Sequence, residues 1–189
     1  MNYKNIEDKL KEMLPEKRLK HSISVSKCAV KLSKIYDCDI EKAKIAGLIH
    51  DCAKYFNDEQ VEYSIKKFNI KLDPLEENNL ALSHSIIGSY IIKDVFNIEE
   101  EDIINAVKYH TTGRENMTLL EKIIYMADLI EDGRKFPLVD ELRELTYGGK
   151  LDEALLLSFN NTIKYVIERN QLIHPRTVSA RNYLLKEIQ

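Results

Sequence analysis

Residues 47–54 read G-L-I-H-D-C-A-K and place a histidine beside an aspartate inside an apolar stretch. A carboxylate among buried apolar side chains is costly unless a cation or several hydrogen-bond donors compensate its charge. Asp128 raises the same question, because it lies in the apolar segment I-I-Y-M-A-D-L-I. The two aspartates therefore indicate a compensating positive charge between the segments that carry them.

The histidines supply the other half of a metal-binding set. His21 by itself fits a surface or capping role, and His174, which precedes a proline, keeps a structural interpretation. Neutral imidazoles together with carboxylates, however, suit divalent iron, manganese or zinc. Side chains of adjacent residues on a helix point in directions about 100° apart around its axis. A His-Asp pair therefore reaches one metal only if other helices add ligands. From the residues alone, the candidate ligands are His21, His50, Asp51 and Asp128.

Composition sets the class of protein. Hydrophobic residues make up 44% and charged residues 31% of the 189 residues, with a net charge of −3 and no basic block. This balance predicts a globular protein without a nucleic-acid footprint. No apolar run approaches the ~18 residues of a membrane span, and the charged N-terminus lacks a signal-peptide core. The three cysteines form no C-x-x-C pair, which favours a reducing, cytoplasmic location.

Helical periodicity dominates the chain, and we expect an all-α fold. Glycine and proline number only 6 and 4, and apolar residues recur at the 3.6-residue period. Asp39 is expected to cap the third helix, and T-L-L-E at 118–121 has the pattern of a capping box. A single domain over residues 1–189 is predicted, with roughly ten helices near 3–14, 15–36, 39–56, 58–68, 80–95, 99–110, 118–131, 138–147, 152–170 and 176–188.

The ordered pattern H…HD…D resembles that of the HD-domain metal-dependent phosphohydrolases. His84 and His110, which alone fit a core histidine and a partner of a helix dipole, fall between the HD pair and the last aspartate. The segments H-D-C-A-K, Y-H-T-T-G and A-D-L-I-E-D-G-R resemble one bacterial family in particular, the YqeK-type symmetrical bis(5′-nucleosyl)-tetraphosphatases. The resemblance runs from about Pro15 to the C-terminus, and Asp132 stands where many relatives have proline.

The resemblance implies a helical HD fold that holds two divalent transition-metal ions. Iron is expected first, with manganese, cobalt or zinc as alternatives. The implied reaction cleaves diadenosine tetraphosphate into two ADP molecules. The expected partner is this nucleotide, with no nucleic acid and no membrane, and a homodimer is left open. The implied metal ligands are His21, His50, Asp51, His84, His110 and Asp128.

The implied set of metal ligands suggests a role for Asp51 and for the candidate residues near the ligands. Asp51 is expected to bridge the metals, since a carboxylate offers two oxygens, and to act catalytically together with Lys54. Lys54 follows His50 by four residues and shares its helix side; the alternative is a lysine facing solvent. Thr111, Thr112 and Gly113 are expected to bind phosphate or else to form only a turn. Arg134 is expected to bind phosphate through its fork, or else to act as a C-terminal helix cation.

Three other functions remain open at this stage. A different HD hydrolase would act on a nucleoside monophosphate, a nucleoside triphosphate or a cyclic nucleotide. A diiron oxygenase would need oxygen and would leave Lys54 and Arg134 without phosphate partners. A non-catalytic nucleotide sensor would have no need for a pair of metals that activates water.

Overall fold

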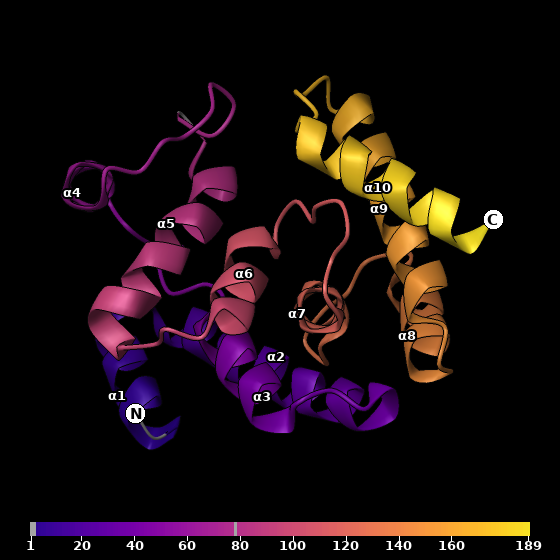
Figure 1. The fold of residues 1–189 in the computed structure, drawn as a ribbon, viewed down its shortest axis with the longest axis horizontal. Helices are drawn as coiled ribbons and strands as arrows, with labels where there is room; N and C mark the ends of the chain where they lie inside the picture. Colours follow the sequence, from indigo (N-terminus) through magenta and orange to yellow (C-terminus); the bar gives the residue numbers. More distant parts are fainter. Residues whose placement is uncertain (1–2, 78) are drawn as a thin grey trace.

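The structure, a computed structural model, describes residues 3–77 and 79–189, and these ranges contain ten helices and no strand (Figure 1). The fold is therefore all-α, as the periodicity predicted. The helices are α1 (Tyr3–Met13), α2 (Glu16–Tyr36), α3 (Ile40–Ile49), α4 (Asp58–Phe68), α5 (Leu80–Phe96), α6 (Glu101–Tyr109), α7 (Leu119–Ile130), α8 (Val139–Tyr147), α9 (Leu151–Glu168) and α10 (Pro175–Ile188).

Five helices form the part of the fold that matters for the site. Helix α2 packs along α3 and against α7, while α6 lies between α5 and α7 and also contacts α3 (Figure 1). Their shared interior is filled by fully buried side chains such as Leu32, Ile49, Ile87 and Ile123. Helix α9 packs on α8 and α10, and both α8 and α9 contact α7, at the side of the molecule that carries the C-terminus.

Most helix starts match their sequence signals. The Asp39 carboxylate accepts a hydrogen bond from the Lys42 N–H at 3.0 Å, and Thr118 forms the predicted capping box with Glu121. Pro175 is the first residue of α10, where its missing N–H costs nothing. One start differs slightly, because Pro15 precedes α2 as its N-cap instead of lying in its first turn.

The third helix is shorter than predicted, because it ends at Ile49 and not near Phe56. Beyond it the backbone hydrogen bonds span three residues instead of four, from Cys52 N–H to Ile49 O and from Lys54 N–H to Asp51 O. The His-Asp pair thus lies in tight turns that follow the helix. The expectation that both residues belong to a continuous helix was wrong, since an apolar 3.6-residue pattern does not distinguish a helix from successive turns of similar backbone curvature.

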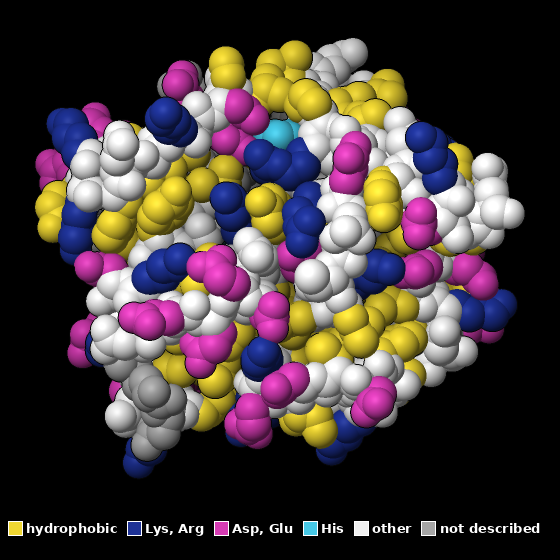
Figure 2. Space-filling view, in the orientation of Figure 1, with side chains coloured by type: hydrophobic (Ala, Val, Ile, Leu, Met, Phe, Trp, Pro, Cys, Tyr) yellow, Lys and Arg dark blue, Asp and Glu magenta, His cyan; other side chains and the backbone are white. Residues whose placement is uncertain are grey.

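The surface and helix lengths agree with a globular chain. On the face seen in Figure 2, basic and acidic side chains lie interspersed among apolar ones. Within residues 3–77 and 79–189, no helix combines the length and the apolar character needed to cross a bilayer.

The crossing of α2 and α3 depends on a glycine. A Cβ atom at Gly47 would lie 2.9 Å from Ser26 Cα and 3.1 Å from Ser26 N, both of which belong to backbone that cannot move aside cheaply. This close approach brings the end of α3, and with it the His-Asp pair, against the helix that carries His21.

We expect Gly47→Ala to destabilise the protein by about 1–3 kcal/mol, since it forces the two backbones apart. Gly88→Ala is the matched control, because a Cβ there meets its nearest neighbour, Cys52 Sγ, at an ordinary 3.5 Å. It should gain about 0.5–1 kcal/mol from helix propensity. Denaturant unfolding of both variants measures the difference, and equal effects at the two positions would contradict the role given to Gly47.

Candidate metal and phosphate site

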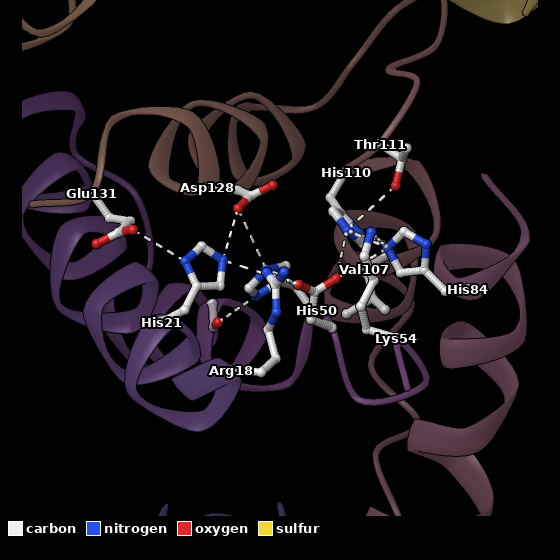
Figure 3. A network of polar contacts seen from close by, with 12 residues as sticks. Arg18, His21, His50, Lys54, His84, Val107, His110, Thr111, Asp128 and Glu131 are labelled. Carbon is white, nitrogen blue, oxygen red and sulfur yellow. Dashed lines mark hydrogen bonds and ion pairs between the residues drawn. The ribbon is translucent and has the colours of Figure 1, made fainter. Parts of the chain in front are cut away.

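The six predicted metal ligands come from five segments and meet in one place (Figure 3). Helix α2 supplies His21, helix α5 supplies His84 and helix α7 supplies Asp128. The remaining ligands follow the ends of helices: His50 and Asp51 come directly after α3, and His110 comes directly after α6. Three of the six side chains therefore enter the space between the helices from positions just after the ends of α3 and α6.

Asp51 stands between two groups of ligand atoms. Its Oδ2 lies 3.3 Å from His50 Nε2 and 4.0 Å from His21 Nε2. Its Oδ1 lies 3.0 Å from His84 Nε2 and 3.5 Å from His110 Nε2. On the first side, Asp128 Oδ1 lies 2.9 Å from His21 Nε2. One carboxylate thus faces two imidazole pairs with its two oxygens.

Each ligand histidine is held in a single tautomer by the acceptor at its Nδ1. His50 Nδ1 lies 2.8 Å from Gly47 O, His84 Nδ1 lies 2.8 Å from Leu80 O, and His110 Nδ1 lies 2.7 Å from Val107 O. A carbonyl oxygen only accepts, so these Nδ1 atoms carry the protons and the Nε2 lone pairs point into the site. His21 differs, because its Nδ1 faces the Glu131 carboxylate at 3.1 Å.

The donor set fits divalent metal ions. His84 Nε2 and His110 Nε2 lie 3.2 Å apart, and with both Nδ1 atoms protonated their lone pairs face each other. Among the described residues, the buried atoms His21 Nε2, His50 Nε2 and Asp51 Oδ1 make no hydrogen bond. Lone pairs and carboxylates that converge without donors need a cation, and nitrogen and oxygen ligands suit borderline transition metals.

The carboxylates are kept ionised. Burial alone raises the pKa of Asp51, but the surrounding imidazoles, His50 first, hold it well below its ordinary value when they carry positive charge. Burial likewise opposes ionisation of Asp128, whereas His21, His50 and Arg134 together lower its pKa. Burial lowers the pKa of His84 to about 4, against the attraction of Asp51. Ionised carboxylates and a neutral His84 are the states that metal ligands require. A bound cation would supply the positive charge that His50 supplies in its absence.

Two predicted phosphate contacts lie at the rim of the cluster. Lys54 Nζ is 3.3 Å from His84 Nε2, and burial lowers the pKa of this amine although Asp51 and Asp128 oppose the shift. The Arg134 guanidinium donates to both the carboxylate and the backbone carbonyl of Asp128. Both cations therefore stand next to predicted metal ligands.

The Thr-Thr-Gly segment lies at the other end of the cluster. Thr111 Oγ1 is 3.3 Å from His110 Nε2, and Thr112 is buried and donates to Gly113 O at 2.9 Å. Gly113 has a φ of +65° and no room for a Cβ against Phe159, and its N–H already donates to Tyr109 O at 2.8 Å. The phosphate contact predicted for Gly113 would require that bond to open, so the structure gives this residue a turn role.

Sequence reasoning missed two residues of the site. The Arg18 guanidinium donates to Asp51 Oδ2 at 2.8 Å from the same helix as His21. Glu131, buried at the end of α7, accepts from His21 and from the Gly133 N–H. Each lies three residues from a ligand, Arg18 before His21 and Glu131 after Asp128, and that spacing places side chains on one helix face. This three-residue spacing in the sequence could have identified both residues as part of the site.

A second His/Asp/Glu cluster is a closed hydrogen-bond network. His174 Nε2 lies 3.0 Å from Asp73 Oδ2 and 3.1 Å from Glu76 Oε1, while its Nδ1 accepts from the Arg176 N–H at 3.1 Å. Because Nδ1 accepts, Nε2 carries the proton and has no lone pair for a metal. The cluster ties the loop before α5 to the start of α10, which agrees with the structural role predicted for His174.

Comparisons with known proteins agree with this geometry. The HD domain family matches residues 18–132. The chain is 35% identical to the symmetrical bis(5′-nucleosyl)-tetraphosphatase of Staphylococcus aureus over 97% of its own length and 94% of the relative. It is 38% identical to the enzyme of that name from Bacillus subtilis, over 93% and 94% of the two chains. A crystal structure from Clostridium acetobutylicum, described as a predicted HD superfamily hydrolase involved in NAD metabolism, is 47% identical with a TM-score of 0.94 and covers 99% of this chain and 98% of that one.

The site and the fold thus define a metal-dependent hydrolase of the HD class. Within that class, the chain belongs to the family of symmetrical bis(5′-nucleosyl)-tetraphosphatases, as the resemblance in its sequence implied.

We expect the purified protein to hold about two divalent metal ions per chain, as two-metal hydrolases do. Asp51→Ala should lose both ions and all turnover, because both imidazole pairs face this carboxylate. His84→Ala should lose only the ion on the side of His84 and His110. Metal analysis of the three proteins measures this. Absence of metal from the wild type, with no activity gained on adding iron, manganese or cobalt, would refute the assignment.

Glu131→Ala should weaken metal binding about 10–100-fold, since His21 then loses the acceptor that fixes its tautomer. Asp132→Ala is the matched control, because Asp132 is the exposed neighbour. The measurement is metal retained after dialysis against graded chelator, with thermal unfolding in parallel. Equal retention by the two variants would show that Glu131 does not position His21.

Proposed function

We propose that this chain hydrolyses diadenosine tetraphosphate at the centre of its phosphate bridge, which yields two ADP molecules. The observation that carries the proposal is similarity over nearly the whole chain to curated symmetrical bis(5′-nucleosyl)-tetraphosphatases. The site supports it, because ligands for a metal pair and the three cations Arg18, Lys54 and Arg134 meet in one place. A polyanionic substrate needs this neutralisation.

Asp51 is proposed as the bridging ligand of two metal ions. His21, His50 and Asp128 complete one position, and His84 and His110 complete the other. We assign iron as the preferred ion, with manganese, cobalt or zinc as alternatives that the same ligands accept. When bound, the metals supply Lewis acidity and a water of lowered pKa.

The chain's own residues hold the substrate for an in-line displacement. A water oxygen forms a bond to a phosphorus beside the central bridging oxygen, and the bond from that phosphorus to the bridging oxygen breaks. Both electrons of the broken bond go to the departing ADP. One proton of the water is released to solvent, and the other stays on the oxygen that is now bonded to phosphorus. Lys54 and Arg134 contact non-bridging oxygens, where they hold the phosphorus in place and balance the charge of the transition state.

A cavity of about 740 Å³ is proposed to take one nucleoside of the substrate. We call it the apolar cavity, because Leu75, Leu82, Ile163 and Val166 line it and none of its described lining residues is Lys or Arg. Thr111 and Thr112 also line it, so it opens directly beside the His110 end of the metal cluster. The amides of Asn79, Asn170 and Gln171 on its wall offer donors and acceptors to the edge of a base.

Other substrates remain as alternatives that product analysis separates. An HD hydrolase for nucleoside mono- or triphosphates, or for cyclic nucleotides, would use the same metal cluster. We further propose a cytoplasmic location, which suits the three free thiols Cys28, Cys38 and Cys52.

Limited digestion of diadenosine tetraphosphate by the metal-loaded protein should give ADP as the only nucleotide product. Off-centre cleavage would give ATP and AMP instead, and chromatography separates these species. A mixture dominated by ATP and AMP would overturn symmetrical cleavage while leaving the metal site intact. Arg134→Ala should slow ADP formation without loss of bound metal, because its guanidinium contacts Asp128 and is not itself a ligand.

A further inference from the structure

A second cavity, of about 530 Å³, opens at the opposite end of the metal cluster from the apolar cavity. His21 and Glu131 line it, and these residues lie at the far end of the cluster from Thr111 and His84 (Figure 3). Four cations also line it, which are Lys17, Arg18, Lys20 and Arg134. We call it the basic cavity. The two cavities therefore differ in chemistry, and the metal ligands lie between them.

A symmetrical dinucleotide cut at its centre needs room on both sides of the cut. If one nucleoside lies in the apolar cavity, the phosphate chain passes the metals and its second half emerges beside His21. The basic cavity is the space that the structure offers there. Arg18 and Arg134 line it and also donate to the predicted ligands Asp51 and Asp128. Lys17, Lys20 and Tyr55 line it as well, and all three are exposed.

We propose that Lys17, Lys20 and Tyr55 form the subsite for the second nucleoside diphosphate, the half that departs. This inference rests on the proposed function. The Tyr55 side chain is 52% exposed, and the Arg18 guanidinium lies 6.0 Å from its ring centroid. An exposed ring backed by a guanidinium is a stacking platform for a base, and such stacking tolerates any base.

The charge of the departing half explains the four cations. When the central bond breaks, the departing ADP keeps the bridging oxygen and gains negative charge at the phosphate nearest the metals. Arg18 and Arg134 lie next to that phosphate, and Lys17 and Lys20 continue the positive charge toward solvent. Charge that develops during the reaction is stabilised best by cations already in place. The nucleoside in the apolar cavity receives no such cation from the described residues that line it.

Without the inferred subsite, Lys17, Lys20 and Tyr55 are ordinary surface side chains. Lys20 Nζ lies 2.5 Å from Glu16 Oε1 on the exposed side of α2, and an exposed pair of this kind contributes little to stability. Their replacement should then affect neither folding nor nucleotide binding. The two interpretations therefore differ in an observable way.

The first test counts ADP molecules bound to the metal-loaded protein by calorimetric titration. Two ADP should bind to the wild type, one in each cavity, with unequal affinities. Tyr55→Ala and the double variant Lys17→Gln/Lys20→Gln should retain only the ADP of the apolar cavity. A wild type that binds a single ADP at saturation would overturn the subsite.

The second test compares two ligands that differ only in the second nucleoside. Tyr55→Ala should raise KM for diadenosine tetraphosphate about tenfold, the loss expected for one stacked base. The inhibition constant of adenosine 5′-tetraphosphate, which has the phosphate chain but no second base, should stay unchanged. Equal changes for both ligands, or no change for either, would overturn the role of Tyr55.

Matched controls exclude general effects of charge and exposure. Lys27→Gln removes an exposed lysine from the same helix, and Tyr63→Ala removes a ring that is 64% exposed on α4. Neither residue lines the basic cavity, and both variants should behave as the wild type.

Failure of the proposed function looks different, because the wild type would then form no ADP from diadenosine tetraphosphate. In that event the number of ADP molecules bound by the wild type is the test that decides whether the subsite exists.

Discussion

The structure depends on one constraint. Lone pairs of histidine and carboxylate side chains converge on one buried site between the helices. The Nδ1 atoms of His50, His84 and His110 are each committed to a backbone carbonyl. Their Nε2 atoms therefore point inward as acceptors, toward carboxylates that are also acceptors. Such an arrangement is unfavourable without positive charge, which bound metal ions would supply. The same arrangement fixes the ligand atoms before a metal arrives, so little reorganisation is needed on binding.

Of the four Nδ1 contacts made by His21, His50, His84 and His110, three are local and one is not. His50 and His110 bond to the carbonyl three residues earlier and His84 to the carbonyl four residues earlier, so a helix end or turn is enough to orient the ring. His21 instead relies on Glu131, which lies 110 residues further along the chain. Its tautomer is set only when α2 and α7 have packed together. The close approach at Gly47 brings the end of α3 to the same helix, so packing and ligand orientation depend on the same contacts.

The predicted metal ligands and the walls of the apolar cavity come from different parts of the chain. The part that matches the HD domain, residues 18–132, contains all six predicted ligands. The apolar cavity also uses α9, α10 and the loop between them, which lie beyond that part. The hydrogen bonds of His174 and Glu76 tie this loop to the segment before α5 and so hold the cavity walls together. In the proposed function, the metal cluster determines the bond that is broken, and the C-terminal helices help to hold one of the two nucleosides.

The sequence alone determined the all-α class, most helix starts and the residue types of the metal cluster. These features are local, since capping residues and the 3.6-residue period act within one helix, and a carboxylate in an apolar segment implies compensation wherever it packs. Only the tertiary structure decided that His50 and Asp51 follow a helix instead of lying within one, and that Arg134 and Thr111 belong to opposite ends of the site. It alone brought Arg18 to Asp51 and Glu131 to His21. The physical reason is that these contacts join separate helices, and spacing along the chain does not encode the angle at which helices cross.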